Sequence, residues 1–134
     1  MKKLISIVIF IVVVLSLTAC GGSIKEAKTH EVESEMYTKE DITSAIETIK
    51  KEFKSNWEGC SLKEIYYAGD DIVKAHQDWA DRNNADEVIV LLSSYYVGPN
   101  GGDGSLNQDY TYTNWNWILV RTSGGKWVHV DHGY

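Results

Sequence analysis

The chain has 134 residues, with 19 acidic residues against 13 basic ones and a formal net charge of -6. A chain this acidic is not a nucleic-acid binder, because contacts with phosphates need clustered Lys and Arg side chains. Its length is enough for one domain and too short for two.

The chain begins with a segment typical of a secretory signal. Two lysines near the start precede the almost entirely aliphatic residues 4–17, a stretch shorter than the ~20 residues that a membrane-spanning helix needs. Residues 17–20, Leu-Thr-Ala-Cys, resemble the lipobox of bacterial lipoproteins, in which the cysteine is lipidated and becomes the first mature residue. The resemblance implies a signal peptide over residues 1–19, a lipid on Cys20 and a protein anchored at the outer face of the cell membrane. The alternative is an uncleaved short anchor helix with an unrelated cysteine.

Cleavage before Cys20 would lower the net charge to -8, because residues 1–19 carry two Lys and no acidic residue. Anionic head groups repel such a chain, so we expect the domain to stand off the membrane. Lipidation would also leave Cys60 without an intrachain partner, which excludes a disulfide framework. We expect Cys60 to be a small buried apolar residue.

After the lipid anchor the chain is polar. Residues 20–37 lack a sustained apolar face, so we interpret them as the lipidated Cys and a flexible tether. Such a tether reaches on the order of 20–25 Å by random-coil scaling.

Residues 38–134 are predicted to form a single domain that begins with a helix. Thr38 and Asp41 have the spacing of a capping box, with Asp in place of the usual Glu or Gln. An apolar stripe at helical spacing follows and predicts a helix over residues 39–54 that packs against a sheet. The stripe consists of Ile42, Ala45, Ile46, Ile49 and Phe53.

The rest of the domain predicts one more helix and four strands. The strand at 87–97 is apolar on both sides of its alternation, which predicts burial on both faces for part of its length. A loop rich in Gly follows it, and a Gly-Gly pair marks a hairpin turn before the last strand. The predicted segments are a strand at 62–67, a helix at 70–83, and strands at 87–97, 110–122 and 126–132.

This order of elements predicts an α+β fold. The antiparallel sheet would end in a three-stranded C-terminal meander, and the helices would pack on one of its faces.

A leading helix followed by a curved antiparallel sheet resembles the cystatin-like superfold, which is shared with nuclear transport factor two. The end of the chain is similar to that of small, uncharacterised lipoproteins of Gram-positive bacteria. The residues that carry this resemblance are Trp-Ile-Leu-Val-Arg at 117–121, the Gly-Gly turn, Lys126-Trp127 and Asp-His-Gly-Tyr at 131–134. The superfold includes enzymes and binding modules, so it implies a fold and no particular function. The Asp/His pair that its enzymes use inside the cone has no counterpart that we can place here.

Aromatic residues are the first candidates for a binding site. Trp115 and Trp117 share one face of a predicted strand, and aromatic rings beside amides and hydroxyls suit a sugar or peptide ligand. Tyr95 and Trp127 belong to the same candidate set. The alternative is that these rings cover the sheet under the helices.

The last strand holds a second candidate. On an ideal strand His129 and Asp131 share a face, and His132 points the other way. That arrangement suits a His–carboxylate pair for general base catalysis and does not bring three metal ligands together. The alternative is a solvated strand face.

The loop before Tyr110 carries oxygen-bearing side chains at alternate positions from Asp103 to Asp109, as calcium loops do. However, Gln108 and Asn114 occupy the places of the turn glycine and the bidentate glutamate. We therefore interpret it as a polar loop and expect no metal and no cofactor. The chain also has no nucleophile motif, P-loop or dinucleotide fingerprint.

Together these observations favour a membrane-anchored extracytoplasmic domain without enzymatic activity, which binds a protein, peptide or glycan. The first alternative is a small hydrolase or isomerase that works in a cone-shaped aromatic pocket. The second is a structural lipoprotein, such as an immunity-type protein that caps a toxin.

Overall fold

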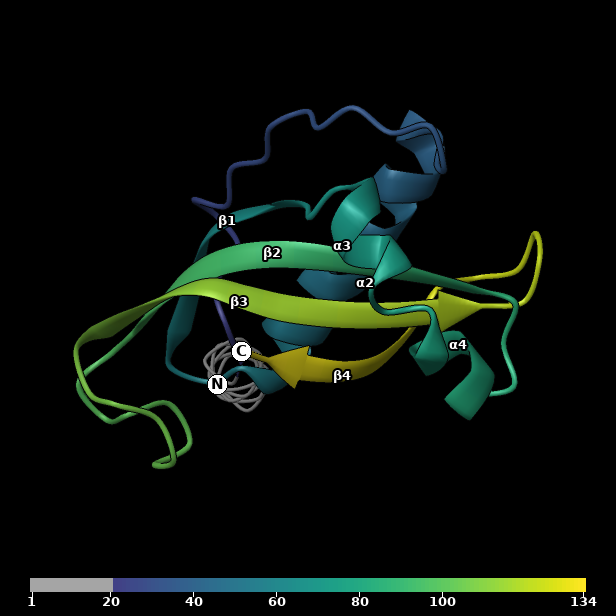
Figure 1. Ribbon diagram of the computed structural model, residues 1–134. Helices are drawn as coiled ribbons and strands as arrows, with labels where there is room; N and C mark the ends of the chain where they lie inside the picture. Colours follow the sequence, from purple (N-terminus) through teal and green to yellow (C-terminus); the bar gives the residue numbers. More distant parts are fainter. Residues whose placement is uncertain (1–20) are drawn as a thin grey trace, which may run out of the picture.

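The computed structural model describes residues 21–134 (Figure 1). The predicted signal peptide and Cys20 lie outside these residues. No helix within the described residues combines the length and the apolar character that crossing a lipid bilayer requires.

The predicted α+β arrangement is confirmed. An N-terminal helix precedes four strands that form one antiparallel sheet in the order β1-β2-β3-β4, so strands that are neighbours in sequence pair directly. The elements are α2 (Lys39–Asn56), β1 (Cys60–Tyr67), α3 (Asp70–Lys74), α4 (Asp78–Arg82), β2 (Glu87–Val97), β3 (Tyr110–Arg121) and β4 (Val128–Gly133).

Helix α2 begins at the predicted capping box. The Asp41 N–H donates to Thr38 Oγ1 at 3.1 Å, and the Thr38 N–H donates back to Asp41 Oδ2 at 3.2 Å. The helix crosses one face of the sheet and lies behind it in Figure 1. Most of the predicted apolar stripe is buried there, namely Ala45, Ile46, Ile49 and Phe53.

The second predicted helix differs in form. Residues 70–83 make two five-residue helices, α3 and α4, instead of one continuous helix. Val73 and Ala80 are their buried residues, whereas Ile72, which was expected on the apolar face, is 40% exposed. Figure 1 shows α3 in front of the sheet, on the face opposite α2 and not on the same face as expected. Residues 88–91 of β2 are therefore fully buried, as the two-sided apolar pattern of that strand predicted.

The segment that precedes α2 is paired with the sheet along part of its length. Ser23 and Lys28 form parallel bridges with β1, and the Leu62 N–H donates to the Ser23 carbonyl at 2.8 Å. The Gly22 N–H donates to the carbonyls of Phe53 and Lys54 at the end of α2, at 3.2 Å each. The part of the expected tether that the structure describes is thus held against the domain and covers the free edge of β1.

Candidate functional site

Aromatic rings from α2, β2, β3, β4 and the end of the chain meet on the α2 face of the sheet. Trp57, the residue that caps α2, lies among them, with its ring centroid 5.1 Å from Trp117, 5.3 Å from Tyr95 and 5.1 Å from His132. We call this set the aromatic cluster. It comprises Phe53, Trp57, Tyr95, Tyr112, Trp115, Trp117, His129, His132 and Tyr134.

A bulge in the pairing of β2 with β3 builds part of this cluster. Tyr112 and Trp115 are three residues apart and would lie on opposite faces of a regular strand. The register shifts opposite Ser93 and Tyr95, and Asn114 has a φ of 54°, in the left-handed region. As a result the rings of Tyr112 and Trp115 lie on the same face, with centroids 5.4 Å apart.

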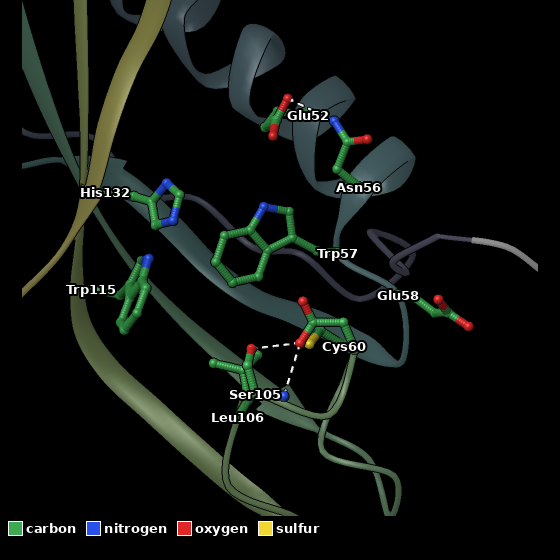
Figure 2. Close-up of a pocket in the computed structure, with 10 residues that line it drawn as sticks. Glu52, Asn56, Trp57, Glu58, Cys60, Ser105, Leu106, Trp115 and His132 are labelled. Carbon is green, nitrogen blue, oxygen red and sulfur yellow. Dashed lines mark hydrogen bonds between the residues drawn. The ribbon is translucent and has the colours of Figure 1, made fainter.

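A cleft of about 460 Å³ opens over one side of the aromatic cluster. In Figure 2 the Trp57 ring lies between Cys60 on one side and the pair Trp115 and His132 on the other. The volume is in the range of small-ligand sites. The lining residues are Glu52, Asn56, Trp57, Glu58, Cys60, Asp103, Ser105, Leu106, Trp115 and His132.

Three carboxylates border the cleft, and none of them forms an ion pair with a described residue. The Asn56 amide donates to Glu52 at 3.0 Å (Figure 2). Asp103 accepts hydrogen bonds from the hydroxyl and the N–H of Ser105, and these bonds lower its pKa. Its carboxyl is therefore ionised at neutral pH.

Cys60 is buried, as predicted, with 2% of its surface exposed. Burial, together with the negative charge of Asp103, raises the pKa of its thiol to about 11. The thiol is therefore protonated at neutral pH and is a poor nucleophile.

Two buried polar atoms of the cluster lack a hydrogen-bond partner among the described residues. They are the Trp115 indole N–H and the Tyr95 hydroxyl, whose pKa is raised by burial. The neighbouring Trp117 indole, in contrast, donates to Ser93 Oγ at 2.7 Å. An unpaired buried donor is uncommon in folded proteins, so the Trp115 N–H at the cleft wall calls for an explanation.

The predicted His129–Asp131 pair does not form. The register of β4 shifts so that Asp131 pairs with Ile118 while His129 pairs with the next residue, Leu119. The expectation that His132 points away from His129 was therefore wrong, because the ideal alternation fails at this irregularity. The two rings face each other, with His129 Nε2 3.2 Å from His132 Nδ1, and burial lowers the pKa of His129.

Trp127 lies in a different place from the other predicted binding residues. It packs under Arg121, whose guanidinium carbon is 4.1 Å from the centre of the indole ring, and its N–H donates to the Asp41 carbonyl. Arg121 also forms ion pairs with Asp41 at 3.0 Å and Glu87 at 2.6 Å. We call Arg121, Trp127, Asp41 and Glu87 the Arg121 cluster.

The structure thus brings Tyr95, Trp115, Trp117 and His129 together and separates Trp127 and Asp131 from them. Sequence reasoning missed Trp57 because the predicted helix ended at residue 54. Its spacing was a usable signal, since Trp57 follows Phe53 by four residues and extends the apolar stripe by one turn.

The loop considered for calcium folds on itself, with Asp103 bonded to Ser105. Within residues 21–134 no group of three or more His, Cys, Asp or Glu side chains is placed to hold a metal ion. Comparison with family models, with curated proteins and with solved structures gives no match, so the function of this site has to be argued from its own residues.

Proposed function

We propose that this chain is a lipid-anchored extracytoplasmic binding domain and that the cleft beside Trp57 is its ligand site. The observation that carries the proposal is a cleft walled by Trp57, Trp115 and His132 and bordered by carboxylates. Aromatic walls with a few polar groups are the usual composition of a ligand site. A hydrolase or isomerase finds less support, because its base pair of His129 and Asp131 is not assembled.

The ligand site can be tested with two matched tryptophan variants. A panel of peptides and glycans is screened for ligands that raise the unfolding temperature of the full-length protein in detergent, since a ligand that binds only the folded state stabilises it. Trp57→Leu should abolish the shift. Trp79→Leu should keep it, because Trp79 stacks on Arg82 in α4 and does not line the cleft. A shift that survives Trp57→Leu, or a panel without any effect, would count against the proposal.

We propose the lipid anchor from the sequence of the first twenty residues. The segment that follows supports a position of the domain close to the membrane. Gly22 is hydrogen-bonded to the end of α2. A lipid on Cys20 would therefore be attached two residues away from a fixed point of the domain. The domain would then lie close to the membrane surface and not at the end of a long tether.

Mass spectrometry of the native protein tests the anchor itself. We expect acyl groups on a chain that begins at Cys20, and Cys20→Ala should abolish the acylation. Cys60→Ala is the control and should leave it in place, because Cys60 is buried in the folded domain. An intact initiator methionine in the native protein would contradict the proposal.

The placement of the anchor has its own test. A Cβ atom on Gly22 would lie 2.5 Å from the Phe53 carbonyl oxygen and 2.7 Å from the Phe53 ring. Gly22→Val should therefore release the segment, and trypsin should cleave after Lys25 and Lys28 roughly tenfold faster or more. Thr29→Val, at an exposed position, is the control. Equal cleavage of both variants and the wild type would show that the segment is not held there.

We also propose that the fold belongs to the cystatin-like class. The support is an antiparallel sheet with a helix from the N-terminal side across one face, and a register shift in each of the three strand pairings, of the kind that bends a strand. A crystal structure compared with members of that class would decide the point.

A further inference from the structure

We infer that the cleft beside Trp57 binds a cationic side chain of a basic peptide, with the arginine guanidinium as the group that fits best. This inference rests on the proposed function and names the chemical class of its ligand. The cleft has an acidic lining and aromatic walls, and a second site in the same protein already holds such a group.

The charge of the lining selects for a cation. Glu52, Glu58 and Asp103 border the cleft, and its ten lining residues include no Lys or Arg. Glu52 and Asp103 are each oriented by a hydrogen bond from a neighbour, which leaves acceptor positions free on both carboxylates. An anionic ligand would meet repulsion here, whereas a guanidinium or ammonium group would find charged acceptors.

The aromatic walls favour the same ligand. A guanidinium group is planar and weakly hydrated, and it stacks on the faces of Trp side chains while it pairs with carboxylates. Figure 2 shows Trp57 and Trp115 in the same cleft as Glu52. A neutral sugar would use the rings and would leave the carboxylates without a counter-charge.

The protein contains its own example of this recognition. In the Arg121 cluster a guanidinium lies 4.1 Å from the centre of the Trp127 ring and pairs with two carboxylates. The cleft repeats that set of groups, tryptophan rings with carboxylates, but none of its lining residues supplies the cation. The cation that Arg121 supplies in its own cluster would thus come from a ligand at the cleft.

One atom of the site favours a peptide over a simple amine. The Trp115 indole N–H is buried and has no partner among the described residues. A basic peptide carries the cation and a carbonyl acceptor in one molecule, and its carbonyl would reach this buried N–H once the Trp115 side chain shifts on binding.

The test uses a matched pair of probes, acetyl-Gly-Arg-Gly-amide and the same peptide with citrulline, which has nearly the shape of arginine but no charge. Full-length protein in detergent is titrated with each peptide, and the indole N–H signals of the five tryptophans are followed by NMR. We expect the Arg peptide to shift the Trp57 and Trp115 signals. The citrulline peptide should bind at least about tenfold more weakly, and high salt should weaken the binding of the Arg peptide.

Protein variants complete the test. Glu52→Gln combined with Asp103→Asn should weaken binding of the Arg peptide by about tenfold or more. These changes preserve side-chain shape, and the signals of Trp117 and Trp127 report whether the fold is intact. Asp131→Asn is the matched control, because Asp131 is exposed, acidic and absent from the cleft lining. It should bind the Arg peptide as the wild type does.

The outcomes separate this inference from the function on which it rests. Equal binding of the two peptides would overturn the inference and leave the cleft as a ligand site. Signals that respond to vesicles of phosphatidylethanolamine and not to the Arg peptide would also overturn it, in favour of a lipid head group. No response to any probe at millimolar concentration would overturn the inference as well. The ligand site itself is tested separately, by the panel of peptides and glycans screened against the wild type and Trp57→Leu.

Discussion

The Arg121 cluster and the cleft beside Trp57 are built from the same kinds of side chain, but they differ in how completely those side chains are paired. At Arg121 the guanidinium contacts Asp41, Glu87 and the Trp127 ring, and the Trp127 N–H has an acceptor. At the cleft, within residues 21–134, the carboxylates form no ion pair and the Trp115 N–H has no hydrogen-bond partner.

This difference underlies the structural role that we assign to the Arg121 cluster and the binding role that we propose for the cleft. The Arg121 cluster joins the start of α2 to β2, β3 and the residue before β4, so its paired groups stabilise the fold. Unpaired polar groups beside a cleft contribute little to the fold and are free to act on a ligand. The presence of aromatic residues alone does not distinguish the two roles. The sequence therefore places Trp127 and Trp115 in the same candidate set.

The largest expected effect is on the Arg121 side. Arg121→Met removes the cation from two partly buried carboxylates and should lower the free energy of unfolding by about 3 kcal/mol. Arg82→Met is the control, since Arg82 also pairs with a carboxylate and stacks on a tryptophan but is more than half exposed. It should lower the free energy by less than about 1 kcal/mol. Urea denaturation of both variants measures the difference, and equal losses would refute the assigned role.

Two tyrosine variants compare the loss of a hydrogen-bonded hydroxyl with the loss of an unbonded one. The Tyr37 hydroxyl donates to the Val88 carbonyl at 2.6 Å, and Tyr37→Phe should lower the free energy of unfolding by about 1 kcal/mol. Tyr95→Phe should leave the free energy of unfolding unchanged or raise it slightly, because the hydroxyl that it removes is buried and has no partner in the described part of the chain. Thermal unfolding of both variants tests this, and a clear loss for Tyr95→Phe would reveal a partner for its hydroxyl.

The smallest expected effect is a difference in pH dependence. Arg121 lowers the pKa of Asp41, so this pair adds stability above the ordinary Asp pKa near 3.8, and that stability is lost only as the pH falls further. Burial and the neighbouring His132 lower the pKa of His129 from 6.5, although Glu52 and Asp131 act against the shift. Protonation of His129 therefore opposes folding as the pH falls below 6.5.

Denaturation curves at several pH values test this difference. Stability of the wild type should begin to fall below pH 6.5, and His129→Gln should remove that part of the loss. The loss below about pH 4 should remain in this variant and should become smaller in Asp41→Asn, while the part that comes from other carboxylates with a lowered pKa, such as Asp70, should persist. A wild-type curve that is flat between pH 6.5 and 4 would contradict the assignment to His129.

The parts of the fold that were predictable are those where a local pattern acts alone. The capping box at Thr38 and the apolar stripe after it defined α2, and the two-sided apolar run defined the buried part of β2. The strand irregularities at Asn114 and between Ile118 and Leu119 were not predictable, since they arise from pairing between strands. Each of them moves side chains to the other face, and together they brought Tyr112 and His132 into the aromatic cluster.

The segment from Gly22 to Lys28 escaped prediction for a similar reason. Its side chains are mostly polar, and its main chain pairs it with β1, while only Ile24 and Ala27 pack against the core. Sequence patterns report side chains, and two apolar residues do not make a recognisable strand pattern.

That pairing also has a mechanical consequence. Residues 23–28 run parallel to β1, joined to it by four main-chain hydrogen bonds, and Gly22 is joined to the end of α2. A pull applied at the N-terminus would act along the strand and load these bonds together in shear, which resists force better than opening them one at a time. Tension on the N-terminal end of the chain would therefore pass into both the end of α2 and the edge strand of the sheet.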